Sequence, residues 1–109
     1  MTRAPTILVL AVATACSSGF TPAPTPAIVA AMPDSIPCDK AVKVEAWGDR
    51  QGIRAERRWL DAFYPRHGAY VQSLRGAGGR KYDVLSFPRA NGHLAWVCFD
   101  ITSMYGHLP

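Results

Sequence analysis

HLAWVCFDI, at residues 93–101, is apolar at nearly every position. Successive side chains of an extended strand point to opposite faces of a sheet. Apolar side chains then fall on both faces, with Ala95, Val97, Phe99 and Ile101 on one and Leu94, Trp96 and Cys98 on the other. A strand that is apolar on both faces belongs inside a sheet rather than at its edge. We therefore predict that residues 93–101 form a central strand.

The residues before this strand predict one helix and three more strands. Alternating apolar residues indicate a strand over 42–47, which Gly48-Asp49 ends. A helical apolar pattern continues to Tyr64, and Pro65 stops it. Strands are expected at 69–74 and 81–87, with a glycine loop between them and Asn91-Gly92 as a tight turn before the last strand. The prediction is an α+β domain in the order β-α-β-β-β, an antiparallel sheet of about four strands with one helix on a face.

The first 15 residues are organised like an export signal. Arg3 and the amino terminus supply positive charge, Ile7–Val12 form an apolar core, and small residues follow at 13–15. The stretch Thr6–Ala15 is much shorter than the ~20 residues that a membrane-spanning helix needs, and no later stretch is long enough either. We predict a signal peptide over 1–15; the alternative is a buried N-terminal strand or helix.

Three cysteines are an odd number for an exported chain. Residues 12–16, VATAC, resemble the lipobox of bacterial lipoproteins, although leucine is more usual where Ala13 stands. That resemblance implies cleavage before Cys16, attachment of diacylglycerol to its sulfur, and a membrane anchor. Cleavage after Ala15 by ordinary signal peptidase, without lipid, is the alternative.

The fate of Cys16 decides how the other cysteines are used. If Cys16 carries lipid, Cys38 and Cys98 remain as a pair, and we predict a structural disulfide between them. A cross-link over about 60 residues is worth on the order of 4 kcal/mol in a domain with a small core. If Cys16 is not lipidated, one thiol stays free in an oxidising compartment.

Residues 16–37 are rich in proline, which lacks an N–H and disfavours helices and sheet ladders. We predict an extended, polyproline-like tether over 16–37 and a folded domain over 38–109. In the alternative, the apolar residues Ile28–Met32 dock onto the domain.

The chain has a formal net charge of +4, which falls to +3 when Arg3 leaves with the signal peptide. This spread-out excess does not indicate a nucleic-acid partner. Arg50, Arg54 and Arg58 recur every four residues of the predicted helix. Together with Trp47 they form a candidate contact face for anionic lipid or an acidic envelope protein; the alternative is an ordinary solvated face.

The polar residues predict no metal site and no cofactor. The histidines, His67, His93 and His107, lack the short paired spacing of zinc ligands. No serine is framed like a hydrolase nucleophile, and the glycines before Lys81 lead into a strand rather than into a phosphate-binding helix. Asp83 and Asp100 are candidates for a glycosidase-like carboxylate pair. Whether the chain is an enzyme stays open, with binding favoured.

Together these features predict an exported, lipid-anchored protein of the cell envelope that acts by binding, as an accessory protein, an inhibitor or an assembly factor. Residues 81–106 also look like the C-terminal hairpin of small exported bacterial proteins, a resemblance that implies no activity. Two alternatives are a small periplasmic hydrolase that uses a histidine with serine or aspartate, and a secreted protein without an anchor.

Overall fold

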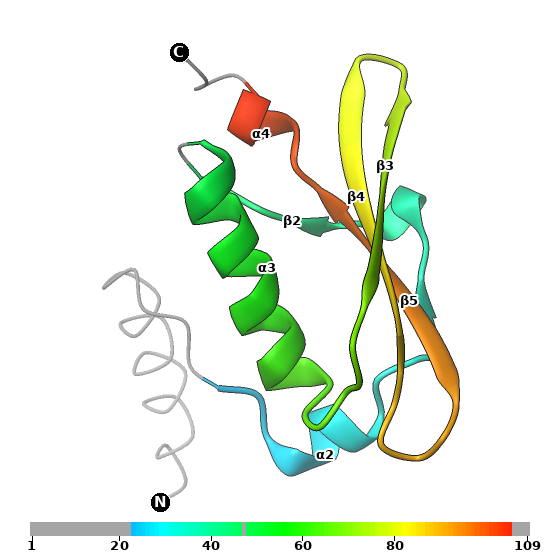
Figure 1. Cartoon of the computed structure of the whole chain (residues 1–109). Helices are drawn as coiled ribbons and strands as arrows, with labels where there is room; N and C mark the ends of the chain where they lie inside the picture. The colour runs from blue at the N-terminus through cyan, green and yellow to red at the C-terminus, as the bar shows by residue number, and fades with distance from the viewer. Residues whose placement is uncertain (1–22, 47, 106–109) are drawn as a thin grey trace, which may run out of the picture.

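The computed structural model of the protein describes residues 23–46 and 48–105. One long helix, α3 (Asp49–Phe63), lies against one face of a five-stranded sheet (Figure 1). The strands are β1 (Ser35–Ile36), β2 (Val42–Lys43), β3 (Val71–Ala77), β4 (Arg80–Pro88) and β5 (Leu94–Asp100). The smaller elements are the helices α2 (Pro26–Ala30) and α4 (Thr102–Tyr105) and the 3-10 turn η1 (Cys38–Lys40). The predicted α+β class with one main helix is confirmed.

The sheet is mixed in direction. β3, β4 and β5 form an antiparallel meander, and β5 lies inside the sheet, as its two apolar faces predict. β1 and β2 pair one after the other along the far side of β5, and both run parallel to it. The predicted strand at 42–47 is therefore shorter, and it is not antiparallel. Each of these strands pairs over two residues only, too few for an alternating pattern to specify direction.

The core lies between α3 and the sheet. The apolar side chains of β4 and β5 that face α3 are fully buried: Leu85, Phe87, Ala95, Val97 and Phe99. From the helix, Leu60 is fully buried and Trp59 packs edge-on against Phe99, with ring centroids 5.4 Å apart. The tyrosine that follows the helix, Tyr64, packs in the same way on Phe87 at 5.1 Å.

The second half of the predicted tether is folded, so the expectation of an extended chain there is wrong. Pro26 begins α2, at a position where a helix needs no N–H donor, and the hydroxyl of Thr25 caps that end. Further along, Met32 and Ile36 pack against the core, and the Tyr64 hydroxyl donates to the Pro33 carbonyl at 2.7 Å. The packed chain thus begins well before residue 38.

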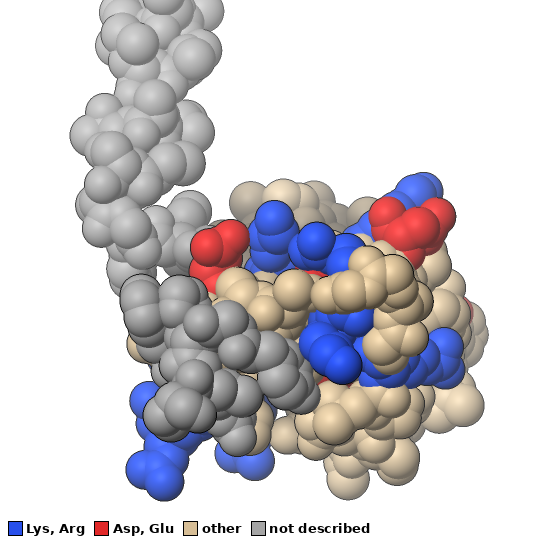
Figure 2. Space-filling view, turned by 90° about the horizontal axis from the view of Figure 1, so that it is seen from above, with Lys and Arg blue, Asp and Glu red and all other residues tan. Residues whose placement is uncertain are grey.

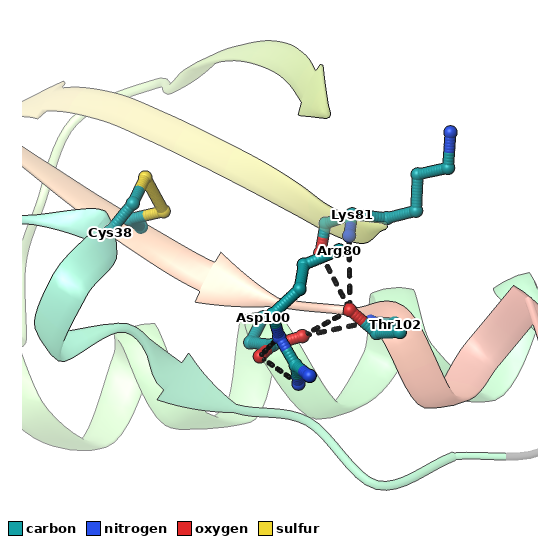
Figure 3. Close-up of a disulfide and its surroundings, with 6 residues drawn as sticks. Cys38, Arg80, Lys81, Asp100 and Thr102 are labelled. Atoms are coloured by element: carbon teal, nitrogen blue, oxygen red, sulfur yellow. Dashed lines mark hydrogen bonds and ion pairs between the residues drawn. A yellow bond between two sulfur atoms is a disulfide. The ribbon is translucent and has the colours of Figure 1, made fainter. Parts of the chain in front are cut away.

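Cys38 and Cys98 form the predicted disulfide, 60 residues apart in sequence (Figure 3). Cys98 is fully buried in β5, on the face of the sheet away from α3, and η1 brings Cys38 to it from the segment between β1 and β2. The bond fastens the N-terminal segment to the central strand.

Three predictions fall outside the described residues: the signal peptide over 1–15, lipidation at Cys16, and a contact role for Trp47. Over 23–46 and 48–105, no helix has the length and apolar character needed to cross a bilayer.

Candidate binding surfaces

The arginines of α3 form an exposed row on the side of the helix that faces away from the sheet. Gly52, Glu56 and Leu60 are buried against the sheet. Arg54 comes two residues after Gly52, and Arg58 comes two residues after Glu56. Two residues turn a side chain about 200° around the helix, so both arginines point away from the sheet. Together with Arg50 they are exposed, and none of the three has an ion-pair partner in the described part of the chain. We call Arg50, Arg54 and Arg58 the arginine row.

Burial of acids makes the surface more basic than the formal charge suggests. Glu56, Asp83 and Asp100 are all buried. Of the exposed acids, Asp34 is paired with Arg89 and Asp61 with His67. Figure 2 is seen from the end that carries α4 and the β3–β4 hairpin; among the charged side chains in this view the basic ones predominate, and the acidic ones lie largely at the margins. This surface suits an anionic partner.

Two buried carboxyl groups meet between the helix and the sheet, a pair that the sequence analysis did not identify. Glu56 on α3 is 4% exposed, and Asp83 on β4 is 2% exposed. Burial, followed by the interaction with Asp83, raises the pKa of the Glu56 carboxyl to about 9. Glu56 therefore keeps its proton at neutral pH and can share it with Asp83. Asp83 Oδ2 accepts from the Gln72 amide at 2.9 Å, and its buried Oδ1 has no hydrogen-bond partner among the described residues.

The candidate carboxylate pair of Asp83 and Asp100 does not form. Asp83 pairs in register with Phe99, so it faces α3, whereas Asp100 is the next residue along β5 and faces the opposite side of the sheet. Two carboxyl groups on opposite faces of a sheet cannot act on one glycosidic bond.

Asp100 instead joins the hairpin to the start of α4 (Figure 3). Its Oδ1 accepts from the backbone N–H and the hydroxyl of Thr102, at 3.0 and 2.6 Å. Its Oδ2 accepts from the Arg80 guanidinium, 2.6 Å from Nη2. Burial by itself would raise the pKa of Asp100, but these bonds from Thr102 and Arg80 outweigh it and hold that pKa below its usual value. The role of Asp100 is structural.

Both described histidines contact an aspartate, and neither contacts a serine. His67 uses both ring nitrogens, Nε2 with Asp61 at 2.8 Å and Nδ1 with the Gly68 carbonyl at 2.7 Å. His93 Nδ1 lies 3.1 Å from Asp34, so this pair holds the β4–β5 loop against the N-terminal segment. His107 lies outside the described residues.

A shallow hollow of about 220 Å³ lies where α2, the end of α3 and the β4–β5 loop meet. Phe63, Tyr64, Arg66 and Arg89 are among its lining residues, and neither described histidine is. Arg89 is engaged within the domain, because its Nη1 donates to Asp34 at 2.7 Å and to the Met32 carbonyl at 2.9 Å. Residues 23–46 and 48–105 contain no cluster of three or more potential metal ligands.

The edge strand β3 is the second accessible surface. All of its seven residues are exposed, and β4 is its sole partner among the described strands. It contains no proline, and its register with β4 runs from Val71–Ser86 to Ala77–Arg80 without a bulge. The sequence predicted a strand here over 69–74 but gave no sign that it lies at the edge. Long, regular, exposed edges are sites where another strand can pair.

No protein-family model, curated protein or solved structure matches this chain.

Proposed function

We propose that the chain is an exported protein of the cell envelope, anchored to a membrane by lipid on Cys16, and that it acts by binding. The arginine row on α3 is the surface that we assign to an anionic membrane surface. The observation that carries this assignment is the set of three exposed guanidinium groups, none of which has an ion-pair partner in the described part of the chain.

The Cys38–Cys98 disulfide supports export. Structural disulfides form and persist in oxidising compartments and are rare in the cytosol. With those two sulfurs joined, Cys16 is the remaining cysteine of the chain, and it directly follows the small residues of the lipobox-like stretch.

The folded segment from Pro26 onward supports close contact with a membrane. Residues that were expected to hold the domain away from the bilayer pack on the domain instead. A chain spans at most about 3.5 Å per residue, so no more than roughly 32 Å can separate Cys16 from Thr25. A domain held this closely has one side near the headgroups.

The position of α2 supports α3 as that side. The described chain begins on the side of the sheet that α3 covers, drawn in blue in Figure 1, and α2 contacts α3. A short linker from this point brings the arginine row, rather than the open face of the sheet, toward the membrane. Each basic residue near an anionic membrane surface contributes about 1 kcal/mol.

The anchor is tested by intact mass and membrane fractionation of the wild-type chain and of Cys16→Ser. We expect acyl mass and membrane recovery for the wild type, and loss of both for the variant. A wild-type chain without acyl mass would refute the anchor and leave the untethered secreted protein as the description.

The arginine row is tested by flotation of the exported Cys16→Ser chain with vesicles, so that lipid on the cysteine does not contribute. Glutamine at positions 50, 54 and 58 removes about 3 kcal/mol of attraction, which corresponds to a roughly hundredfold weaker partition onto anionic vesicles. The matched control places glutamine at Lys40, Lys43 and Arg75, which removes three exposed positive charges outside α3. Equal losses for the two triple variants would show that net charge, and not this face, governs binding.

The hydrolase alternative finds little support in the described geometry. Both ring nitrogens of His67 are occupied, so it has no free nitrogen with which to activate a nucleophile. His93 has a free Nε2, but no serine contacts it among the described residues, and the hollow does not include it.

A further inference from the structure

We propose that β3 binds the β3 strand of a second copy of this chain, antiparallel and centred on Leu74, so that the two sheets become one continuous sheet. The pairing is argued from β3 itself. The stability of the pair on a membrane rests on the proposed lipid anchor.

The hairpin turn determines which backbone groups of β3 point outward. Gly78 and Gly79 have φ of 58° and 80°, the left-handed conformation of a two-residue type I′ turn. Such a turn closes on a hydrogen-bonded pair, which here is Ala77 and Arg80. Hydrogen-bonded and non-bonded pairs alternate along an antiparallel ladder. Backbone groups that point away from β4 therefore belong to Gln72, Leu74 and Gly76.

The outward backbone groups of β3 can pair with the same groups of a second copy. A two-fold axis through Leu74 places Leu74 opposite its own copy and Gln72 opposite Gly76 of the second copy. Each outward N–H then meets an outward C=O, so the pairing leaves none of these groups without a partner. Any regular edge strand has outward groups that alternate in this way, so the backbone permits the pairing without selecting the partner. We assign a second copy rather than a foreign peptide to this edge because centring on Leu74 pairs all seven residues of β3 and gives the side-chain pairs described next.

The side chains of β3 also suit this pairing. Leu74, 62% exposed, meets the second Leu74 on the side of α3. On the open face Val71, 71% exposed, meets Ala77 of the other copy. Arg75, the one charged residue of the strand, stands opposite Ser73 and not opposite a second arginine. Directly opposed apolar pairs stabilise a strand pair, and directly opposed like charges would weaken it.

The symmetry is compatible with two anchored copies. Neighbouring antiparallel strands are related by an axis perpendicular to the sheet, so both α3 helices lie on the same face of the joined sheet. The described chain also begins on the α3 side in each copy (Figure 1). Both Cys16 anchors can therefore reach one membrane, and both arginine rows face it. A single strand pair is a small interface that is weak in dilute solution, and confinement to a membrane raises the effective concentration.

The test is a cysteine at position 74 in the full exported chain with Cys16→Ser, so that the new cysteine is the one left unpaired. At the two-fold centre the two Cα atoms lie about 5.5 Å apart, within the range of a disulfide. The matched control is Ser73→Cys, on the same exposed strand, whose Cα atoms in the two copies lie about 8 Å apart, too far for a bond. We expect the Leu74→Cys dimer at roughly tenfold higher yield under mild oxidation.

A second variant is designed to prevent pairing between two copies while each copy stays folded. The N–H of Leu74 points away from β4, so Leu74→Pro keeps the β3–β4 ladder and removes a donor from the outer edge. We expect the variant to remain folded by circular dichroism and to lose concentration-dependent sedimentation. Leu94→Ser is the matched control, because Leu94 is 74% exposed on β5, away from this edge; it should sediment as wild type.

Equal cross-linking at positions 73 and 74, or a chain that stays monomeric at all concentrations and on vesicles, would overturn the pairing. Failure of the anchor is a separate outcome. If intact mass finds no acyl group but Leu74→Cys cross-links selectively, the pairing stands and the proposed anchor does not.

Discussion

Protonation of Glu56 predicts an unusual dependence of stability on pH. In the unfolded chain this carboxyl ionises near its ordinary value of 4.5, whereas burial and Asp83 raise its pKa to about 9 in the fold. Below 4.5 both states hold the proton, so Glu56 has no effect on stability. Between 4.5 and 9 folding must take up a proton, so the contribution of Glu56 lowers the free energy of unfolding as pH rises. Above 9 the contribution levels off.

The perturbation is Glu56→Gln. Each pH unit within this window lowers the free energy of unfolding by about 1.4 kcal/mol. A pH of 7 lies roughly 2.5 units above the ordinary pKa of 4.5. At pH 7 the proton that Glu56 takes up on folding thus lowers the free energy of unfolding by about 3 kcal/mol, relative to acid pH. Glutamine has nearly the same shape, needs no proton and can donate its amide to Asp83. We expect the variant to be more stable at pH 7 by about 2–3 kcal/mol.

The assay is urea unfolding at several pH values between 5 and 9, with the disulfide intact and tryptophan fluorescence as the signal. Wild-type stability should fall with pH relative to Glu56→Gln, and the two curves should converge toward acid pH. Glu45→Gln is the matched control, because Glu45 is exposed in the segment before α3. The reasoning is refuted if Glu56→Gln is less stable than wild type at pH 7, or if the difference between them does not change with pH.

Three other perturbations address the parts that hold the fold together. Alanine at both Cys38 and Cys98 removes a cross-link across 60 residues, and urea unfolding should show a loss of about 4 kcal/mol; an unchanged midpoint would contradict this. Gly52→Ala puts a Cβ 2.3 Å from Sδ of the buried Met104, so the Met104 side chain must leave its packed position, and the thermal midpoint should fall with a loss of about 1–3 kcal/mol. Arg89→Ala frees the segment before β1, whose amides should exchange faster with deuterium while those of α3 keep their protection.

The sequence predicts those parts of the fold whose cause is local. The two apolar faces of β5 require a central strand, Pro65 ends α3 near its observed limit, and Gly92 adopts a φ of 89° in the Asn91-Gly92 turn. The disulfide follows from the cysteine count once Cys16 is set aside. For the strand, the helix end and the turn, a short stretch of residues contains the physical reason for the structure, whereas the disulfide follows from the number of cysteines in the whole chain.

Features that depend on distant partners are not predictable in this way. Proline composition favours an extended tether, yet Pro26 starts a helix because its missing N–H is not needed there. The partner of β1 is β5, about 60 residues further along the chain, and no local pattern indicates it. Glu56 could have been recognised, because it lies four residues before Leu60 in the apolar stripe and so faces the core. A glutamate at that position is a signal of a buried carboxyl.

The disulfide also bears on how the domain would respond to mechanical load. A pull on the chain from the N-terminal side acts first on α2 and then on β1, which are held by hydrogen bonds and packing. The pull then reaches Cys38, where a covalent bond transfers the force directly to β5 in the middle of the sheet. Residues 39–97, which include β2 and α3, lie within the loop that this bond closes and are shielded from tension. A pull can therefore release α2 and β1 while α3 and the strands β3, β4 and β5 stay together, at the cost of the core contacts that Met32 and Ile36 make.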